Sequence, residues 1–141
     1  MTVQEIGDRA LLHESVDRAF PGAKLELYHE RGSFGFRLAM PGLFRPLEAA
    51  ELSDGTLRYL CLVAALLSPR TPPFLALNEP ETSLHSDLLP ALAELIADAG
   101  ERGQVLVTTH AEALAGALEK SGETLSVRLA KRDGATVVAE D

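Results

Sequence analysis

Apolar and polar positions follow patterns that divide the chain into helices and strands. Between residues 3 and 20, apolar side chains recur mostly every three or four positions, which predicts an amphipathic helix. Pro21 and Gly22 end this helix. Residues 24–40 alternate on either side of a turn at residues 31–33, which predicts an antiparallel hairpin. We expect this hairpin to be a structural lid over the core.

A second predicted helix, residues 53–67, is apolar on almost every side after its first turn. Ser53 is a suitable N-cap, and Asp54 complements the positive end of the helix dipole. Because nearly every side chain from Leu57 onward is apolar, the pattern predicts a helix that is covered on most sides. Cys61 lies in this run, and we expect it to be a small core residue rather than a reactive thiol.

Strands and helices alternate in the second half of the chain. The predicted elements are strands at 74–77, 105–109 and 125–129, helices at 86–99 and 111–120, and a hairpin turn into an edge strand at 135–139. This order predicts a parallel sheet with right-handed crossovers and flanking helices. The first two strands are rich in apolar residues, which predicts that they are buried on both faces.

Composition and charge narrow the class of protein. The 141 residues fit one domain, and 46% of them are hydrophobic, which is enough for a core. A net charge of −8 argues against general, charge-driven binding to nucleic acid or anionic membrane, so nucleic-acid contact is expected only indirectly. The longest apolar run, residues 59–67, is far shorter than the roughly 20 residues of a membrane span. One cysteine cannot form an internal disulfide, which favours a reducing cytoplasm.

Two residues with catalytic chemistry follow the ends of the first two predicted parallel strands. Glu79 comes directly after the first strand and His110 directly after the second. Ligands of such sheets bind at the carboxyl ends of the strands, so we expect these side chains to stand side by side. A carboxylate there can act as a general base on water. A neighbouring histidine can position that base or donate a hydrogen bond to a phosphate oxygen.

A third feature that fits phosphate chemistry is the start of the helix at residues 53–67. Its first N–H groups and its dipole form an anion site, and Gly55 would let a phosphate approach closely. Each feature also has an ordinary structural explanation: a cap and turn at Ser53, a solvated loop at Glu79 and a surface residue at His110. The case for a phosphoryl-transfer site rests on the three occurring together at helix and strand ends.

With these three features, the sequence resembles the C-terminal half of an ABC-type ATPase domain. It is most similar to the predicted soluble ATPases that resemble RecF and SMC proteins. The resemblance covers about residues 43–118. It rests on four segments. The signature motif is resembled by Leu52-Ser53-Asp54-Gly55-Thr56, and the Walker B strand by residues 74–79, with Glu79 in the place of the catalytic glutamate. The D-loop is resembled by Ser83-Leu84-His85, and the switch histidine by Thr109-His110.

The resemblance implies a P-loop NTPase-like α/β fold of the ABC type. A single domain would span residues 1–141, with a helix and hairpin in 1–42 and the motif region in 43–141. It further implies ATP and Mg2+ as cofactors, hydrolysis with Glu79 as general base, and a homodimer or association with a P-loop-containing ATPase chain. By the same resemblance, Ser53, Asp54 and Gly55 would contact ATP held by the opposite subunit, and Ser83, Leu84 and His85 would lie at the interface.

Two departures from the family pattern limit these expectations. The sequence contains no Gly-x-x-x-x-Gly-Lys-Ser/Thr, the P-loop that holds the α- and β-phosphates. The chain alone is therefore expected to be inactive, and its sheet should show a gap, an exposed edge or a rearrangement. Asn78 stands where the family usually has the Walker B aspartate. It can reach Mg2+ through a bound water, but it contributes no charge.

Three hypotheses follow from these observations. The chain is part of an ATPase whose P-loop lies upstream or on another chain, with the signature segment acting in trans. Alternatively, it is a catalytically inactive binding module that docks on a complete ATPase. In the third hypothesis, the chain is an unrelated α/β domain in which the motifs are coincidental. A structure in which Glu79 and His110 point away from each other would support it.

Overall fold

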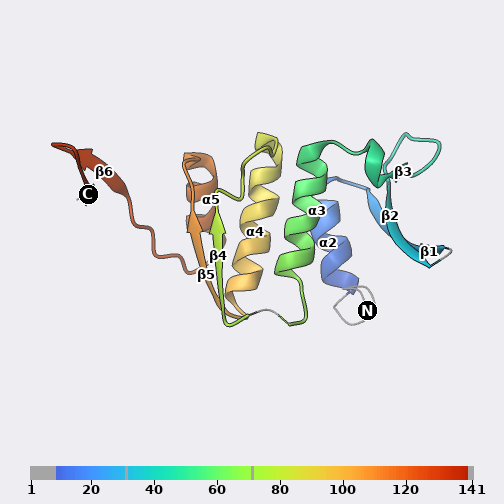
Figure 1. Ribbon diagram of the computed structural model, residues 1–141, viewed down its shortest axis with the longest axis horizontal. Coiled ribbons are helices and arrows are strands. Elements are labelled where there is room, and N and C mark those ends of the chain that lie inside the picture. The colour runs from blue at the N-terminus through green and yellow to red at the C-terminus, as the bar shows by residue number, and fades with distance from the viewer. Residues whose placement is uncertain (1–8, 31, 71, 140–141) are drawn as a thin grey trace.

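A computed structural model describes residues 9–30, 32–70 and 72–139 of the chain (Figure 1). The elements in order are α2 (Arg9–Ala19), β1 (Lys24–Glu30), β2 (Ser33–Ala39), β3 (Leu47–Glu48), the 3-10 helix η1 (Ala49–Glu51), α3 (Asp54–Leu66), β4 (Phe74–Asn78), the 3-10 helix η2 (Ser86–Leu88), α4 (Leu89–Gly100), β5 (Gln104–Thr108), α5 (Glu112–Ser121), β6 (Leu129–Arg132) and β7 (Ala135–Val138). The mixed α/β fold class is confirmed.

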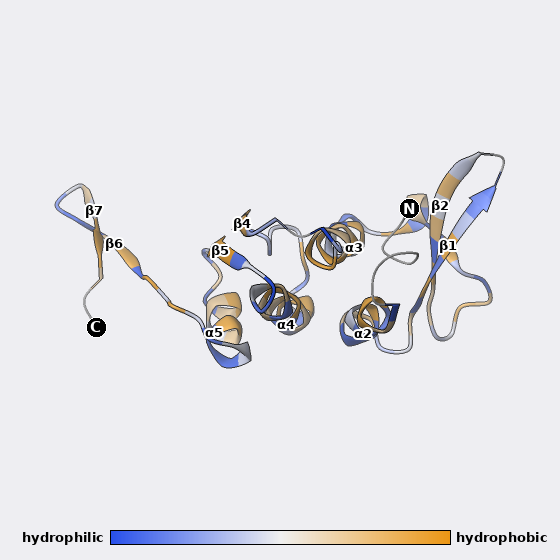
Figure 2. Cartoon of the chain, turned by 90° about the horizontal axis from the view of Figure 1, so that it is seen from below, coloured by the Kyte–Doolittle hydropathy of each residue, from blue (hydrophilic) through white to orange (hydrophobic). Residues whose placement is uncertain are grey.

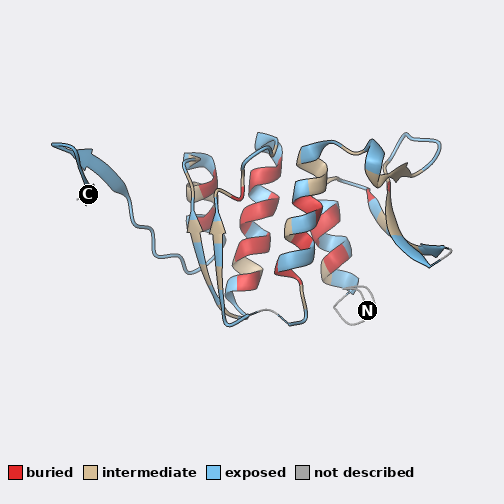
Figure 3. Ribbon diagram, viewed as in Figure 1, coloured by how far each residue is buried: buried red, intermediate tan, exposed pale blue. Residues whose placement is uncertain are grey.

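Helix α4 lies at the centre of the hydrophobic core. It packs against α2 and α3 on one side and α5 on the other (Figure 1). Its side chains Leu92, Leu95 and Ala99 are almost completely buried, as the three- and four-residue spacing predicts. Pro90 lies in the first turn of α4, where its missing N–H removes no helical hydrogen bond. Figure 3 shows buried residues, coloured red, on the facing sides of α2, α3, α4 and α5.

The predicted N-terminal helix and hairpin are both confirmed. The described part of the helix is α2, whereas residues 1–8 lie outside the described ranges. Strands β1 and β2 pair antiparallel, and the base of the hairpin packs on the core through the buried Leu38. The hairpin then extends away from the helices (Figure 1). Its sheet has a short third strand, β3, which was not predicted from the sequence.

Strands β4 and β5 pair in parallel, with Asn78 opposite Thr108. The prediction that they are buried on both faces is wrong. Alternate residues are half-buried against the helices, whereas Phe74 and Leu106 on the other face are 50% and 53% exposed. Viewed from below, both strands lie on one side of α4 and α5, and among the described residues no element covers their outer face (Figure 2). Within the part of the chain that the structure describes, β4 and β5 pair only with each other, so the sheet has the expected exposed edge.

Helix α3 is covered less than its composition predicts. Its inner face is buried through Tyr59, Val63 and Leu66. Its outer face is open to solvent, and Cys61 lies there as an exposed free cysteine. The predictions of a largely covered helix and of a core cysteine are therefore wrong. Among the described residues, helices pack against one side of α3 and leave the side that carries Cys61 uncovered.

The C-terminal segment differs most from the sequence analysis. The strand predicted at residues 125–129 does not join the parallel sheet, since residues 122–128 are irregular and β6 begins only at Leu129. The predicted hairpin turn is confirmed: Asp133 and Gly134 both have positive φ and join β6 to β7. This hairpin stands clear of the helices (Figure 1). Its side chains, including Leu129 and Val138, are mostly exposed.

Within the described ranges, no helix has both the length and the apolar character that crossing a membrane requires.

Candidate functional site

Glu79 and His110 lie against each other at the carboxyl ends of β4 and β5. The distance between His110 Nε2 and Glu79 Oε1 is 3.0 Å. The side chains are 90% and 41% exposed for His110 and Glu79, so both can reach a ligand in solvent. The two residues are far apart in sequence and meet because parallel strands end at the same edge of a sheet. The side chains therefore do not point apart, which is the arrangement that would have supported the third hypothesis.

The backbone fixes the position of Glu79. Its φ of 46° lies in the left-handed region, which is unfavourable for a residue with a side chain. Its N–H donates to the carbonyl of Thr108 at 2.8 Å, which continues the pairing of the two strands by one residue. Its carbonyl accepts a hydrogen bond from Arg58 Nη2 of α3 at 3.3 Å. The turn after β4 is therefore tied to both β5 and α3.

A second carboxylate near the site, Glu81, was not among the residues predicted from the sequence. Its Oε1 accepts hydrogen bonds from the Thr109 hydroxyl and, at 3.3 Å, from the backbone N–H of His110. Partial burial raises the pKa of Glu81, but the hydrogen bonds from Thr109 and from backbone N–H groups outweigh it and lower the pKa. The repeated carboxylate in Glu79-Pro80-Glu81 was the available signal for this residue.

Asn78 is held by its neighbour on β5. Its Oδ1 accepts a hydrogen bond from the Thr108 hydroxyl at 2.6 Å. Among the described residues, no cluster of three His, Cys, Asp or Glu side chains could hold a metal ion. Since Mg2+ prefers carboxylate and other oxygen ligands, the strand end by itself does not fit a protein-ligated Mg2+ site. At most it offers one neutral oxygen that a metal-bound water could contact.

The segment of residues 52–56, which we call the signature-like segment, opens helix α3 as predicted. Ser53 is the N-cap: its Oγ accepts from the Thr56 N–H at 3.2 Å and contacts the Thr56 hydroxyl at 2.9 Å. A Cβ on Gly55 would come within 2.6 Å of the carbonyl oxygen of Ser83. The missing side chain of Gly55 therefore permits close packing within the chain, a role that the sequence analysis did not consider.

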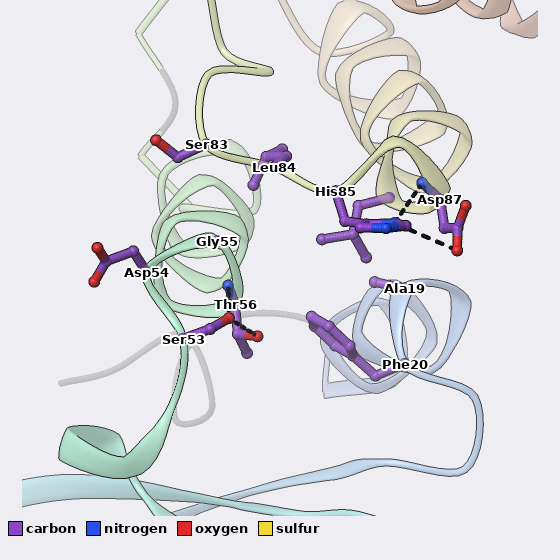
Figure 4. A pocket seen from close by; sticks show the side chains of 11 residues that line it. Ala19, Phe20, Ser53, Asp54, Gly55, Thr56, Ser83, Leu84, His85 and Asp87 are labelled. Atoms are coloured by element: carbon purple, nitrogen blue, oxygen red, sulfur yellow. Dashed lines mark hydrogen bonds and ion pairs between the residues drawn. The ribbon is translucent and has the colours of Figure 1, made fainter.

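The signature-like segment and residues 83–85 line one open groove of about 700 Å3. Figure 4 shows Ser53–Thr56, Ser83–His85 and Asp87 around it, with Ala19 at the end of α2 and the following Phe20. His85 caps η2 by accepting the Asp87 N–H at its Nδ1. Ser83 has a φ of 67° in the left-handed region. The structure thus brings the two segments together on one surface, at the same end of the molecule as Glu79 and His110 (Figure 1).

Arg45 pairs within the chain just before the signature-like segment. Its two terminal nitrogens donate to both oxygens of Glu51 at 2.7 and 2.8 Å. The hydrogen bonds from Arg45 and then from the Glu48 N–H lower the pKa of Glu51 to about 2. The pair ties the loop after β2 to the residue just before the signature-like segment.

Solved structures of SMC ATPase heads have a similar fold. An SMC ATPase described for ATP-driven dimerization and DNA-stimulated activation matches with a TM-score of 0.70 at 17% identity, covering 92% of this chain and 80% of that chain. The Smc head domain of Pyrococcus furiosus, with an extended coiled coil and bound to the C-terminal domain of ScpA, matches with a TM-score of 0.70 at 16% identity, covering 92% and 33%. The SMC head domain of Thermotoga maritima matches with a TM-score of 0.61 at 19% identity, covering 92% and 45%.

The chain spans less than half the length of the Pyrococcus and Thermotoga structures. No curated protein matches it at a significant level. Residues 6–115, well over half of the chain, match a family described as "AAA domain, putative AbiEii toxin, Type IV TA system". The resemblance to SMC-like ATPases and the P-loop NTPase-type fold are thereby confirmed, and the chain belongs to this AAA-domain family of ATPases.

Proposed function

We propose that the chain supplies the base and the signature surface of a composite ATP-hydrolysing site, with Glu79 as the general base and His110 as its partner. The observation that carries the proposal is the 3.0 Å contact between His110 Nε2 and Glu79 Oε1. Two side chains at the ends of adjacent parallel strands form this contact, where ligands of such sheets bind. The family match supports an ATPase-type activity in general.

The two side chains have different roles in the proposed reaction: His110 donates a hydrogen bond, and Glu79 accepts a proton. When Nε2 of His110 carries the proton, it donates to Oε1 of Glu79 and leaves Oε2 free to accept a proton from an attacking water. The water then attacks the γ-phosphorus in line with the leaving oxygen. His110 is 90% exposed, so a rotation of its side chain can also bring it to a phosphate oxygen.

The signature-like segment would act on ATP bound by another chain. Ser53 caps the Thr56 N–H. The N–H groups before it in the first turn of α3 have no acceptor four residues earlier in the helix and point outward at its N-terminus, where the dipole favours an anion. The groove beside this helix end is open and is lined by Ser83, Leu84 and His85 as well. We therefore assign both segments to one contact surface in an ATP-dependent assembly, either a homodimer or a pair with a P-loop-containing chain.

The P-loop and most of the Mg2+ ligands would have to come from outside residues 1–141. Bound Mg2+ would neutralise phosphate charge in such a site. From this chain, the Asn78 amide oxygen is available only through a water, and it already accepts a hydrogen bond from Thr108. The first measurement is titration calorimetry of Mg-ATP against the purified chain. Under the proposal, the chain alone gives no binding, and binding appears only with a P-loop-bearing partner.

The decisive test is Glu79→Gln in that assembly. The variant keeps the size of the side chain but cannot accept the proton, so ATP binding should persist while hydrolysis falls by about 100-fold or more. Glu119→Gln, at an exposed position on α5, is the matched control and should leave turnover unchanged. Unchanged turnover in Glu79→Gln would exclude Glu79 as the base.

The alternative function is a catalytically inactive module that docks on a complete ATPase. The uncharged Asn78 with its oxygen already engaged by Thr108 favours this alternative. In that case Glu79→Gln would leave the function of the complex intact. Ser53→Arg, which places a large cation in the groove, would abolish it. The proposed hydrolytic role predicts that both variants lose function.

A further inference from the structure

Glu81 links the turn after β4 to the turn after β5. Its Oε1 accepts hydrogen bonds from the Thr109 hydroxyl and from the His110 N–H. Its Oε2 is buried and has no hydrogen-bond partner among the described residues. The side chain therefore points inward between the two turns, unlike the exposed pair formed by Glu79 and His110.

The hydrogen bonds continue from Glu81 into α5. The Thr109 hydroxyl donates to Glu81 and accepts the Ala111 N–H at 2.9 Å. Ala111 is the N-cap of α5 and has no side chain that can cap the helix. The negative charge of Glu81 thus stands at a helix N-terminus, where it is favourable. Three consecutive residues, 109–111, are held by one carboxylate.

His110 is the middle residue of these three. Its backbone N–H is bound to Glu81, while its ring, 90% exposed, reaches Glu79. An exposed ring has few packing contacts to hold it, so its direction depends on the backbone that carries it. We propose that Glu81 is a positioning residue, which fixes the 109–111 turn and thereby directs His110 at Glu79. The catalytic significance of this rests on the proposed function, whereas the geometric part does not.

A plain helix-capping role is the competing explanation, and Glu112 separates the two. Glu112 also places a carboxylate in the first turn of α5, but it is exposed. If Glu81 acts only through charge at the helix end, removing either carboxylate should have a similar effect. If Glu81 acts through Thr109 and His110, only its removal should change the contact between His110 and Glu79.

The first experiment uses the full chain without nucleotide. NMR should show an Overhauser contact between the His110 ring and the Glu79 side chain in the native chain, in Glu112→Ala and in Thr109→Ser, which keeps the hydroxyl. The contact should be lost in Glu81→Ala and Thr109→Val, with spectra that remain dispersed. A retained contact in a folded Glu81→Ala variant would overturn the inference. Glu81→Gln keeps one acceptor oxygen and should restore most of the contact.

The second experiment uses the ATP-hydrolysing assembly. Glu81→Ala should lower kcat by up to about 100-fold with little change in KM, since it misdirects a group that acts in the transition state. Glu81→Gln should recover much of this loss. In a His110→Ala background, Glu81→Ala should have little further effect. Additive losses would refute positioning through His110.

The two experiments separate the inference from the proposed function. Loss of the His110–Glu79 contact together with unchanged turnover would support the positioning role and would refute the hydrolytic role of the pair. A retained contact with reduced turnover would refute the positioning role instead.

Discussion

Replacing Gly55 by alanine tests how the signature-like segment is packed. A Cβ at this position would lie 2.6 Å from the Ser83 carbonyl oxygen, 3.7 Å from its carbonyl carbon and 3.8 Å from the Leu84 Cα. All three are backbone atoms, so no side chain can rotate away. Ser83 has a φ of 67°, so its backbone already adopts an uncommon conformation. We expect Gly55→Ala to force the start of α3 and residues 83–84 apart.

The size of the effect follows from two opposing contributions. Overpacking of this kind costs about 1–3 kcal/mol. Alanine is favoured over glycine in a helix interior by about 1 kcal/mol, and by less in the first turn, where Gly55 lies. The free energy of unfolding should therefore fall by about 1–2 kcal/mol, which corresponds to a decrease in Tm of about 4 °C per kcal/mol.

Gly116 provides a matched control in α5. It also lies within a helix, but no atom lies within 4 Å of the position that its Cβ would occupy. Gly116→Ala should thus gain up to about 1 kcal/mol from helix propensity alone. Urea denaturation of both variants, followed by circular dichroism, should show shifts of opposite sign. If Gly55→Ala is as stable as Gly116→Ala, the close packing against Ser83 is refuted.

This packing also changes how an aspartate at position 55 should be interpreted. The sequence alone suggests Gly55→Asp as a block to ATP-dependent dimerisation through bulk and charge. The structure adds that any side chain here meets the Ser83 carbonyl within the same chain. A dimerisation defect in that variant therefore counts only if its folding is intact. Ser53→Arg needs the same control, because it removes the cap on the Thr56 N–H.

Three further predictions test the core and the corrected exposures. Leu92→Ala, at a fully buried site in α4, should cost about 2–5 kcal/mol in urea denaturation, whereas Leu106→Ala, 53% exposed, should cost much less. Burial raises the pKa of Tyr59 to about 12. The unfolded chain, with a tyrosine pKa of about 10, then loses the proton first, so stability should fall between about pH 10 and 12. Tyr59→Phe should remove this slope while losing about 1 kcal/mol at neutral pH, because it deletes the hydrogen bond to the Ser15 carbonyl. Cys61 is exposed and should react with a thiol reagent in the native chain, which a core cysteine would not do.

Most helices and strands were predicted correctly because hydrophobic periodicity and capping residues depend on neighbours in the sequence. The alternation in β1 and β2 and the N-cap at Ser53 each depend on residues close in sequence. The order of strands and helices was also enough to place Glu79 next to His110, because parallel strands end at one edge. Long-range hydrogen bonds were not predictable, and Glu81 was missed because its partners, Thr109 and His110, lie 28 and 29 positions away.

The predictions of burial that proved wrong share one physical cause. Cys61 on α3, Phe74 and Leu106 on the sheet, and Leu129 on the C-terminal hairpin are apolar, were predicted in covered elements or in the sheet, and are exposed. A parallel sheet normally has both faces covered, yet the described residues cover β4 and β5 only on the side of α4 and α5. An apolar residue in a regular pattern predicts that its side chain is covered in the assembled protein, whether or not the covering residues belong to this chain. In the proposed assembly, a P-loop-bearing partner would cover part of this exposed apolar surface by packing on the outer face of β4 and β5.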